Sequence, residues 1–195
     1  MNWMKKVAVA LVCLLPLGLQ AAKVDTLQVK SPSMNKSIEV VVVSPDMAAT
    51  EACPVIYLLH GYGGNARTWV GIKPDLPKIA DEKGIFFVCP DGKNTWYWDS
   101  PLNADVRYET FISDELVKYV DSHYKTVADR KGRAITGLSM GGHGAMWNGL
   151  RHSDVFSAAG STSGGVDIRP FPKNWEMSVQ IGEKAKYPEN WEKYT

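Results

Sequence analysis

One serine lies in a pentapeptide whose residue types could support nucleophilic chemistry. The run Gly137-Leu138-Ser139-Met140-Gly141 follows a short apolar segment, Ala134–Thr136, and precedes a small-residue stretch compatible with a helix, Met140–Arg151. A serine between a buried strand and a helix sits on a sharp, strained turn that lifts its hydroxyl above the sheet. Glycines two residues before and after it avoid clashes between Cβ atoms and nearby backbone. The pattern favours Ser139 as a nucleophile over the alternative, a glycine-rich turn without chemistry.

A second glycine-rich loop could stabilise the negative charge that nucleophilic attack creates. His60-Gly61-Tyr62-Gly63-Gly64 follows the apolar run Pro54–Leu59. A backbone N–H from such a loop and the N–H after the serine can form an oxyanion hole, and one such donor is worth about 3–4 kcal/mol. The candidate donors are the amides of Tyr62 and Met140. A phosphate-cradling loop is the weaker alternative, since neither of the usual phosphate motifs is present.

A serine nucleophile also needs a histidine base and an acid that orients it. Where the serine sits on a strand–turn–helix elbow of this kind, the chain order is serine, acid, histidine. After Ser139 the histidines are His143 and His152, and no acid precedes either of them there. We expect His143 to pack or lie at the surface, and His152 to sit at a helix end. Upstream, His60 is predicted to brace the glycine loop and His123 to cap a helix. No pair of histidines has metal-ligand spacing, and no metal or cofactor is predicted.

Alternating strands and helices must position these residues. Six segments are predicted to form strands. The apolar ones suit a parallel sheet that is covered by helices on both faces. They are Lys23–Lys30, Ile38–Val43, Pro54–Leu59, Ile85–Cys89, Ala134–Thr136 and Val155–Gly160. Helical spacing occurs over Tyr108–Val120, Met140–Arg151 and, more weakly, Asp75–Lys83. Residues 165–195 lack periodicity and predict a loop-rich excursion that can act as a lid. The fold class is therefore α/β.

The beginning of the chain predicts export. Residues 1–22 combine Lys5 and Lys6, an apolar run and the small residues Ala21 and Ala22, which is the layout of a signal peptide. The apolar run is shorter than the roughly 20 residues that a membrane-spanning helix needs. Cleavage removes two lysines and no acid, so the net charge changes from +1 to −1. We expect a periplasmic or secreted domain, 23–195, that binds neither nucleic acid nor, after cleavage, a membrane.

Two cysteines remain in the mature chain, and we expect them to stay unpaired. Cys53 precedes one predicted strand and Cys89 ends another. If these strands are parallel neighbours, the two sulfur atoms lie at opposite ends of the sheet. A disulfide needs Cα atoms within about 7 Å of each other.

Several ordered motifs resemble a known family. YLLHGYGGN, NTWYWDSP, YETFISDEL, VDSHYKT and ITGLSMGGHGAMWNGLRHSDVFSAAGSTSG are similar to segments of the putative-esterase family of α/β-hydrolases. That family includes S-formylglutathione hydrolases of the esterase D type, feruloyl and acetyl-xylan esterases of carbohydrate esterase family 1, and mycobacterial mycolyltransferases. The resemblance covers about Lys36 to Gly165.

The resemblance implies an α/β-hydrolase fold with Ser139 as nucleophile and the amides of Tyr62 and Met140 as oxyanion hole. It also implies that Trp96, Tyr97 and Trp98 lie near the site. There they either stack on a sugar or aromatic acyl group or pack beneath a loop. The family carries two further strands, whose loops hold the acid and the histidine. We therefore expect this chain to be the N-terminal portion of a longer esterase, lacking the last strands.

The main hypothesis is an exported serine esterase that cleaves feruloyl or acetyl groups from carbohydrate. Without a histidine base the chain is expected to be nearly inactive, since such a loss costs about 10⁶-fold in kcat. An acyltransferase or a serine peptidase of the same fold is an alternative. A non-catalytic carbohydrate-binding protein that uses the aromatic loop is another.

Overall fold

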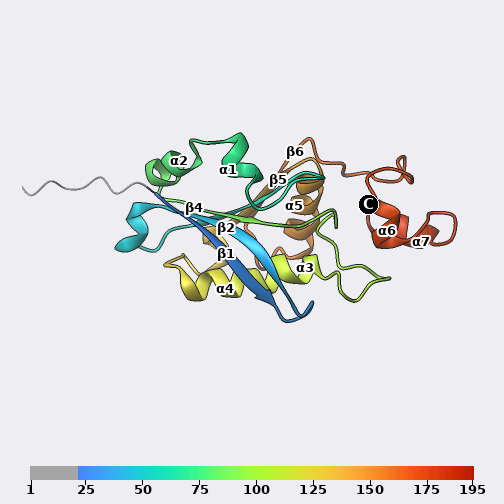
Figure 1. The fold of residues 1–195 in the computed structure, drawn as a ribbon, viewed down its shortest axis with the longest axis horizontal. Helices are drawn as coiled ribbons and strands as arrows, with labels where there is room; N and C mark the ends of the chain where they lie inside the picture. Colours follow the sequence, from blue (N-terminus) through green and yellow to red (C-terminus); the bar gives the residue numbers. More distant parts are fainter. Residues whose placement is uncertain (1–21) are drawn as a thin grey trace, which may run out of the picture.

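The computed structural model describes residues 22–195, and the predicted signal peptide, 1–22, lies almost entirely outside them. The described residues form one six-stranded sheet in the order β1-β2-β4-β3-β5-β6 (Figure 1). The strands are β1 Lys23–Ser31, β2 Lys36–Ser44, β3 Val55–Leu59, β4 Phe86–Pro90, β5 Arg133–Leu138 and β6 Ala158–Thr162. All six predicted strands are present.

The sheet is mostly parallel where the chemistry is predicted. β3 pairs in parallel with both β4 and β5, and β5 pairs in parallel with β6. β1 and β2 form an antiparallel hairpin, which joins the sheet through an antiparallel pairing of β2 with β4. The carboxyl ends of β3 and β5 therefore lie side by side, with Leu59 opposite Gly137. This register brings the glycine loop after β3 next to the serine turn after β5.

Helices cover both faces of the sheet. On one face lie α1 (Thr68–Ile72) and α2 (Leu76–Lys83). On the other lie α5 (Met140–Arg151) and a long helix made of α3 (Tyr108–Thr110), a π-helical turn η2 (Phe111–Glu115) and α4 (Leu116–His123). Two short 3₁₀ turns, η1 (Asp46–Ala49) and η3 (Arg130–Gly132), complete the connections.

The alternation of side chains along β2 explains the two layers. Val40 and Val42 point into the core shared with α5 and the long helix, whereas Val41 and Val43 point into the core beneath α1 and α2. A strand whose consecutive residues are all apolar is buried on both faces, as the sequence pattern predicted. The predicted helices are confirmed, and α5 has the predicted bounds.

Residues 165–195 differ from the expected loop. They contain two short helices, α6 (Met177–Ile181) and α7 (Pro188–Lys193), which lie beyond the end of the sheet where α5 begins (Figure 1). Met177, Ile181 and Trp191 are fully buried and belong to the main core. Helices of five and six residues are too short to show a clear period in the sequence.

Two further predictions concern single segments. Cys53 and Cys89 are unpaired and buried, as the strand arrangement predicted. β6 begins at Ala158, three residues later than predicted, because Val155 and Phe156 belong to the turn that follows α5.

Among the helices of residues 22–195, none combines the length and apolarity that crossing a bilayer requires.

Candidate active site

Ser139 occupies the sharp turn between β5 and α5. Its backbone has φ 54° and ψ −115°, a conformation that non-glycine residues rarely adopt. The Ser139 amide donates to the Thr162 carbonyl at 2.8 Å, and its carbonyl accepts from the His143 amide at 3.0 Å. These bonds tie the strained turn to β6 and to the first turn of α5. The Ser139 residue is exposed, so its hydroxyl is open to a substrate.

Glycine is required on both sides of this serine. A Cβ atom on Gly137 would lie 2.2 Å from the Gly141 carbonyl oxygen. A Cβ atom on Gly141 would lie 2.2 Å from the Leu59 carbonyl oxygen. Both contacts are with backbone, which cannot move aside cheaply. The predicted reason for the two glycines is therefore confirmed.

The glycine loop after β3 lies directly beside Ser139. A Cβ atom on Gly61 would lie 3.5 Å from the Ser139 Cβ atom. Within residues 22–195, neither the Tyr62 amide nor the Met140 amide donates a hydrogen bond. The Met140 amide also belongs to the first turn of the twelve-residue helix α5, where the helix dipole favours negative charge. Two free donors beside an exposed serine suit an oxyanion hole.

His60 braces this loop, as predicted from the sequence, and does not contact Ser139 through either ring nitrogen. Its ring is fully buried. Nδ1–H donates to the Gly61 carbonyl at 2.8 Å, and Nε2 accepts from the Gly92 amide at 2.9 Å. Both ring nitrogens are therefore used to hold backbone.

The other histidines also have structural partners. His143 is buried: its Nε2 accepts from Trp98 Nε1 at 2.9 Å and its Nδ1–H donates to the Gly165 carbonyl at 2.8 Å. Burial lowers the pKa of His143 to about 4. His152 lies 2.9 Å from the Glu109 carboxylate, and His123 donates to a carbonyl in the last turn of α4. Among residues 22–195, no histidine hydrogen-bonds to the Ser139 hydroxyl.

The three aromatic residues predicted to bind substrate are buried. Trp96 is 4% exposed, and Tyr97 and Trp98 are fully buried. The Tyr97 hydroxyl donates to the His60 carbonyl at 3.1 Å. A Cβ atom on Gly144 would lie 2.4 Å from the Tyr97 ring, so this ring packs flush against α5. This arrangement favours the alternative in which Tyr97 and Trp98 pack beneath a loop and do not stack on a substrate group.

A rim segment that the motifs did not reveal adjoins the site. Asn94 Oδ1 accepts from the Gly63 amide at 2.9 Å, and Asn94 Nδ2 donates to the Glu176 carboxylate at 3.3 Å. Partial burial and the nearby Glu176 carboxylate raise the pKa of Tyr62. Glu176 thus faces the glycine loop from the C-terminal segment. The only signal of this rim segment in the sequence was the occurrence of aromatic residues with polar neighbours in 165–195.

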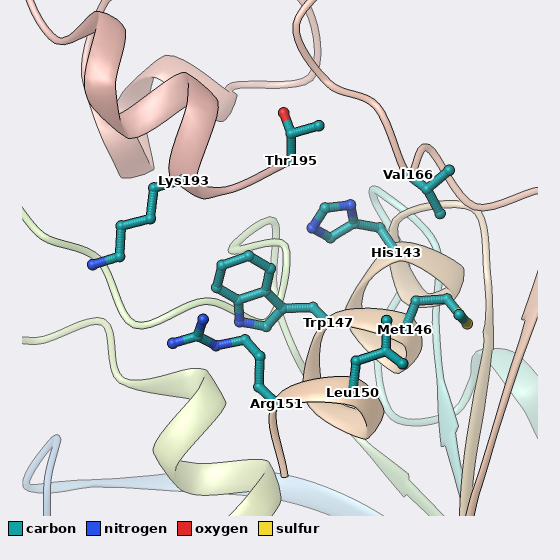
Figure 2. Close-up of a pocket in the computed structure, with 8 residues that line it drawn as sticks. All are labelled: His143, Met146, Trp147, Leu150, Arg151, Val166, Lys193 and Thr195. Atoms are coloured by element: carbon teal, nitrogen blue, oxygen red, sulfur yellow. The ribbon is translucent and has the colours of Figure 1, made fainter. Parts of the chain in front are cut away.

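A separate cavity of about 450 Å³ lies along the outer face of α5 (Figure 2). Ser139 does not line it. The lining residues are His143, Met146, Trp147, Leu150, Arg151, Val166, Lys193 and Thr195. The Arg151 guanidinium lies over the Trp147 ring, 4.5 Å from its centroid. Within residues 22–195, no cluster of three or more histidine, cysteine or acidic residues is arranged to hold a metal ion.

The strand–turn–helix geometry and the adjacent glycine loop agree with a comparison against protein families. A family model described as "Putative esterase" matches residues 31–194. The chain belongs to this esterase family. Its sheet order, with the serine turn after β5, is that of an α/β-hydrolase.

Three relatives illustrate the similarity. The esterase Rv1288 of Mycobacterium tuberculosis is 30% identical over 149 residues, which cover 73% of this chain and 32% of the relative. An endo-1,4-beta-xylanase/feruloyl esterase of Xylanibacter ruminicola is 34% identical over 126 residues, covering 60% of this chain and 17% of the relative. A solved ferulic acid esterase structure superposes with a TM-score of 0.69 at 30% identity, covering 90% of this chain and 71% of that chain. The chain thus spans about a third of the length of the mycobacterial relative.

Proposed function

We propose that this chain carries the nucleophile and the oxyanion hole of a serine esterase that cleaves acyl groups from carbohydrate. Ser139 attacks the ester carbonyl, and the amides of Tyr62 and Met140 hold the oxyanion. The observation that carries the proposal is the exposed, strained Ser139 between β5 and α5, beside a loop with a free amide. The feruloyl esterase relatives support the choice of ester. The layout of residues 1–22 supports export to the periplasm or the medium.

Under this proposal none of the four histidines of the chain is the base that activates Ser139. All four histidines of the chain have structural partners, and none of these partners is Ser139. Removing the histidine of a serine triad costs about 10⁶-fold in kcat, and removing the serine as well then costs little more. We therefore expect very slow hydrolysis of methyl ferulate by residues 23–195, equal in the unchanged chain and in Ser139→Ala.

Imidazole supplied from solution tests the nucleophile itself. A small base that diffuses to the exposed serine can take its proton, so imidazole should accelerate hydrolysis of methyl ferulate by the unchanged chain. The acceleration should be absent in Ser139→Ala, which also measures the hydrolysis that imidazole causes alone. Ser122→Ala, an exposed serine on α4, serves as the matched control and should respond like the unchanged chain.

Two results would contradict parts of the proposal. Equal rates in the unchanged chain and Ser139→Ala at every imidazole concentration would remove Ser139 as the nucleophile. Rapid hydrolysis without imidazole that Ser139→Ala abolishes would keep the nucleophile but overturn the assignment of the base.

A further inference from the structure

Two aromatic side chains stay exposed beside the candidate active site. Phe171 and Trp175 are 43% and 46% exposed. Their ring centroids lie 5.5 Å apart and their planes are tilted by 60°. Large aromatic side chains are usually mostly buried, so an exposed pair at the edge of a site is a candidate binding surface.

Hydrogen bonds tether this pair to the glycine loop. Trp96 Nε1 donates to the Trp175 carbonyl at 3.1 Å. The next residue, Glu176, accepts from Asn94, whose side-chain oxygen in turn accepts from the Gly63 amide. Trp175 is therefore held at a fixed place relative to the loop that carries the Tyr62 amide.

The backbone at this position is strained. Trp175 and Glu176 have φ of 49° and 54°, so two consecutive residues other than glycine adopt the left-handed conformation. Such strain persists only where surrounding contacts impose it, and it concentrates at functional sites. Here the Trp96–Trp175 and Asn94–Glu176 bonds hold the strained turn in place. The Trp175 main chain is thus anchored while its side chain is at the surface.

We propose that the exposed Trp175 ring, with Phe171 beside it, forms a stacking platform for a sugar ring on the alcohol side of the ester. This inference rests on the proposed esterase function and names where its carbohydrate binds. A pyranose ring presents C–H groups on its faces and hydroxyls around its edge, so it stacks on an open aromatic ring while its hydroxyls stay in water. An aromatic acyl group is apolar on both faces and suits an enclosed slot instead. The large exposed fraction of both rings favours the sugar.

Glu176 gives the platform a polar edge. Its carboxylate lies next to Trp175 in the chain and is exposed. A carboxylate beside a stacking ring can accept hydrogen bonds from sugar hydroxyls. The platform therefore combines apolar contact with an acceptor, and it takes over the sugar-stacking role that the sequence suggested for Trp96, Tyr97 and Trp98.

Binding of xylotetraose, followed by titration calorimetry, tests the platform without requiring turnover. We expect Trp175→Ala to weaken binding by about ten-fold, because one stacked ring is lost. Trp175→Phe keeps an aromatic face and should retain most of the affinity. Leu150→Ala is the matched control, since Leu150 is 70% exposed on the outer face of α5, and it should bind like the unchanged chain. Circular dichroism checks that each variant is folded.

Ferulic acid is the second probe and represents the acyl side. We expect Trp175→Ala to bind it as the unchanged chain does. The proposal is overturned if xylotetraose does not bind, if Trp175→Ala binds it unchanged, or if Trp175→Ala weakens ferulic acid binding instead. Since xylotetraose is not an ester, these outcomes are independent of whether Ser139 supports hydrolysis. A chain with Ser139-dependent hydrolysis but no sugar binding would overturn the platform alone.

Discussion

At the scale of single residues, His143 lies one turn after Ser139 and has both ring nitrogens engaged in structural hydrogen bonds. Its ring lies edge-on to Trp96 and Trp98, and both of its nitrogens hold neighbouring groups. One of those groups is the Gly165 carbonyl, in the segment that leaves β6 and passes over the start of α5. A neutral imidazole is needed, because protonated Nε2 could no longer accept from Trp98. His143 is therefore a packing residue that fixes the chain around the serine turn.

The lowered pKa of His143 predicts a loss of stability in mild acid. In the folded protein burial lowers its pKa from 6.5 to about 4, so between these values the unfolded chain binds the proton more readily. The stability that neutral His143 provides is present above pH 6.5 and is lost as the pH falls towards 4. Between pH 7 and pH 5 the free energy of unfolding should fall by about 2 kcal/mol.

Urea unfolding at pH 7 and pH 5 measures this change, and His143→Gln is the control. Glutamine can accept from Trp98 and donate to the Gly165 carbonyl but does not titrate. We expect the variant to lose much less stability over the same interval. Equal losses in both proteins would show that other groups cause the acid sensitivity.

At the scale of elements, the strand that leads to Ser139 is anchored to α4 by an ion pair. Arg133, the first residue of β5, lies 2.6 Å from the Asp121 carboxylate of α4, with the two side chains 7% and 18% exposed. Asp121 also accepts from the Thr126 hydroxyl at 2.7 Å. The start of β5 is thereby fixed against the long helix, and its other end carries the serine turn.

Removing one partner of this ion pair should be costly. Asp121→Ala leaves the Arg133 guanidinium buried without its counter-charge, and we expect a loss of about 3 kcal/mol in the free energy of unfolding. The matched control is Asp114→Ala, which breaks an exposed pair with Lys118 in the same long helix. That change should cost less than about 1 kcal/mol. Urea unfolding compares them, and a similar small cost for both would mean that the Arg133–Asp121 pair does not anchor β5.

At the scale of the whole molecule, the C-terminal segment is part of the core and not a detached lid. Tyr194 stacks on Trp147 with ring centroids 5.0 Å apart, and its hydroxyl donates to the Asp99 carbonyl at 2.8 Å. Trp191 is fully buried, and its indole N–H donates to the Gly182 carbonyl at 2.9 Å. The same segment exposes Trp175 beside the candidate site. The C-terminal segment therefore contributes buried aromatic residues to the core and an exposed one to the rim of the candidate site.

Two tryptophan variants separate these roles. Trp191→Ala removes a fully buried ring and should lower the free energy of unfolding by about 4 kcal/mol. Trp175→Ala removes a ring that is nearly half exposed and should cost less than about 1 kcal/mol. Chemical denaturation monitored by circular dichroism measures both. A small cost for Trp191→Ala would indicate that residues 177–195 unfold independently of the sheet.

Local patterns were enough to predict the strands, the longer helices and the serine turn. Buried parallel strands need continuous apolar runs, and a strained turn between strand and helix needs glycines at fixed spacing. Both requirements depend on residues that are close in the chain. The strands, α5 and the surroundings of Ser139 could therefore be predicted. The unpaired cysteines followed from the predicted strands, because parallel neighbouring strands place Cys53 and Cys89 at opposite ends of the sheet.

Only the tertiary structure decided which aromatic residues are open to a ligand. Trp96, Tyr97 and Trp98 have the composition of a binding loop, yet α5 and the C-terminal segment bury them. Trp175 lies 79 positions after Trp96 and comes to the surface through a hydrogen bond that no local pattern encodes. Exposure depends on contacts between distant parts of the chain. The sequence by itself therefore determined the position of the Ser139 turn, and the packing of residues 165–195 decided what surrounds it.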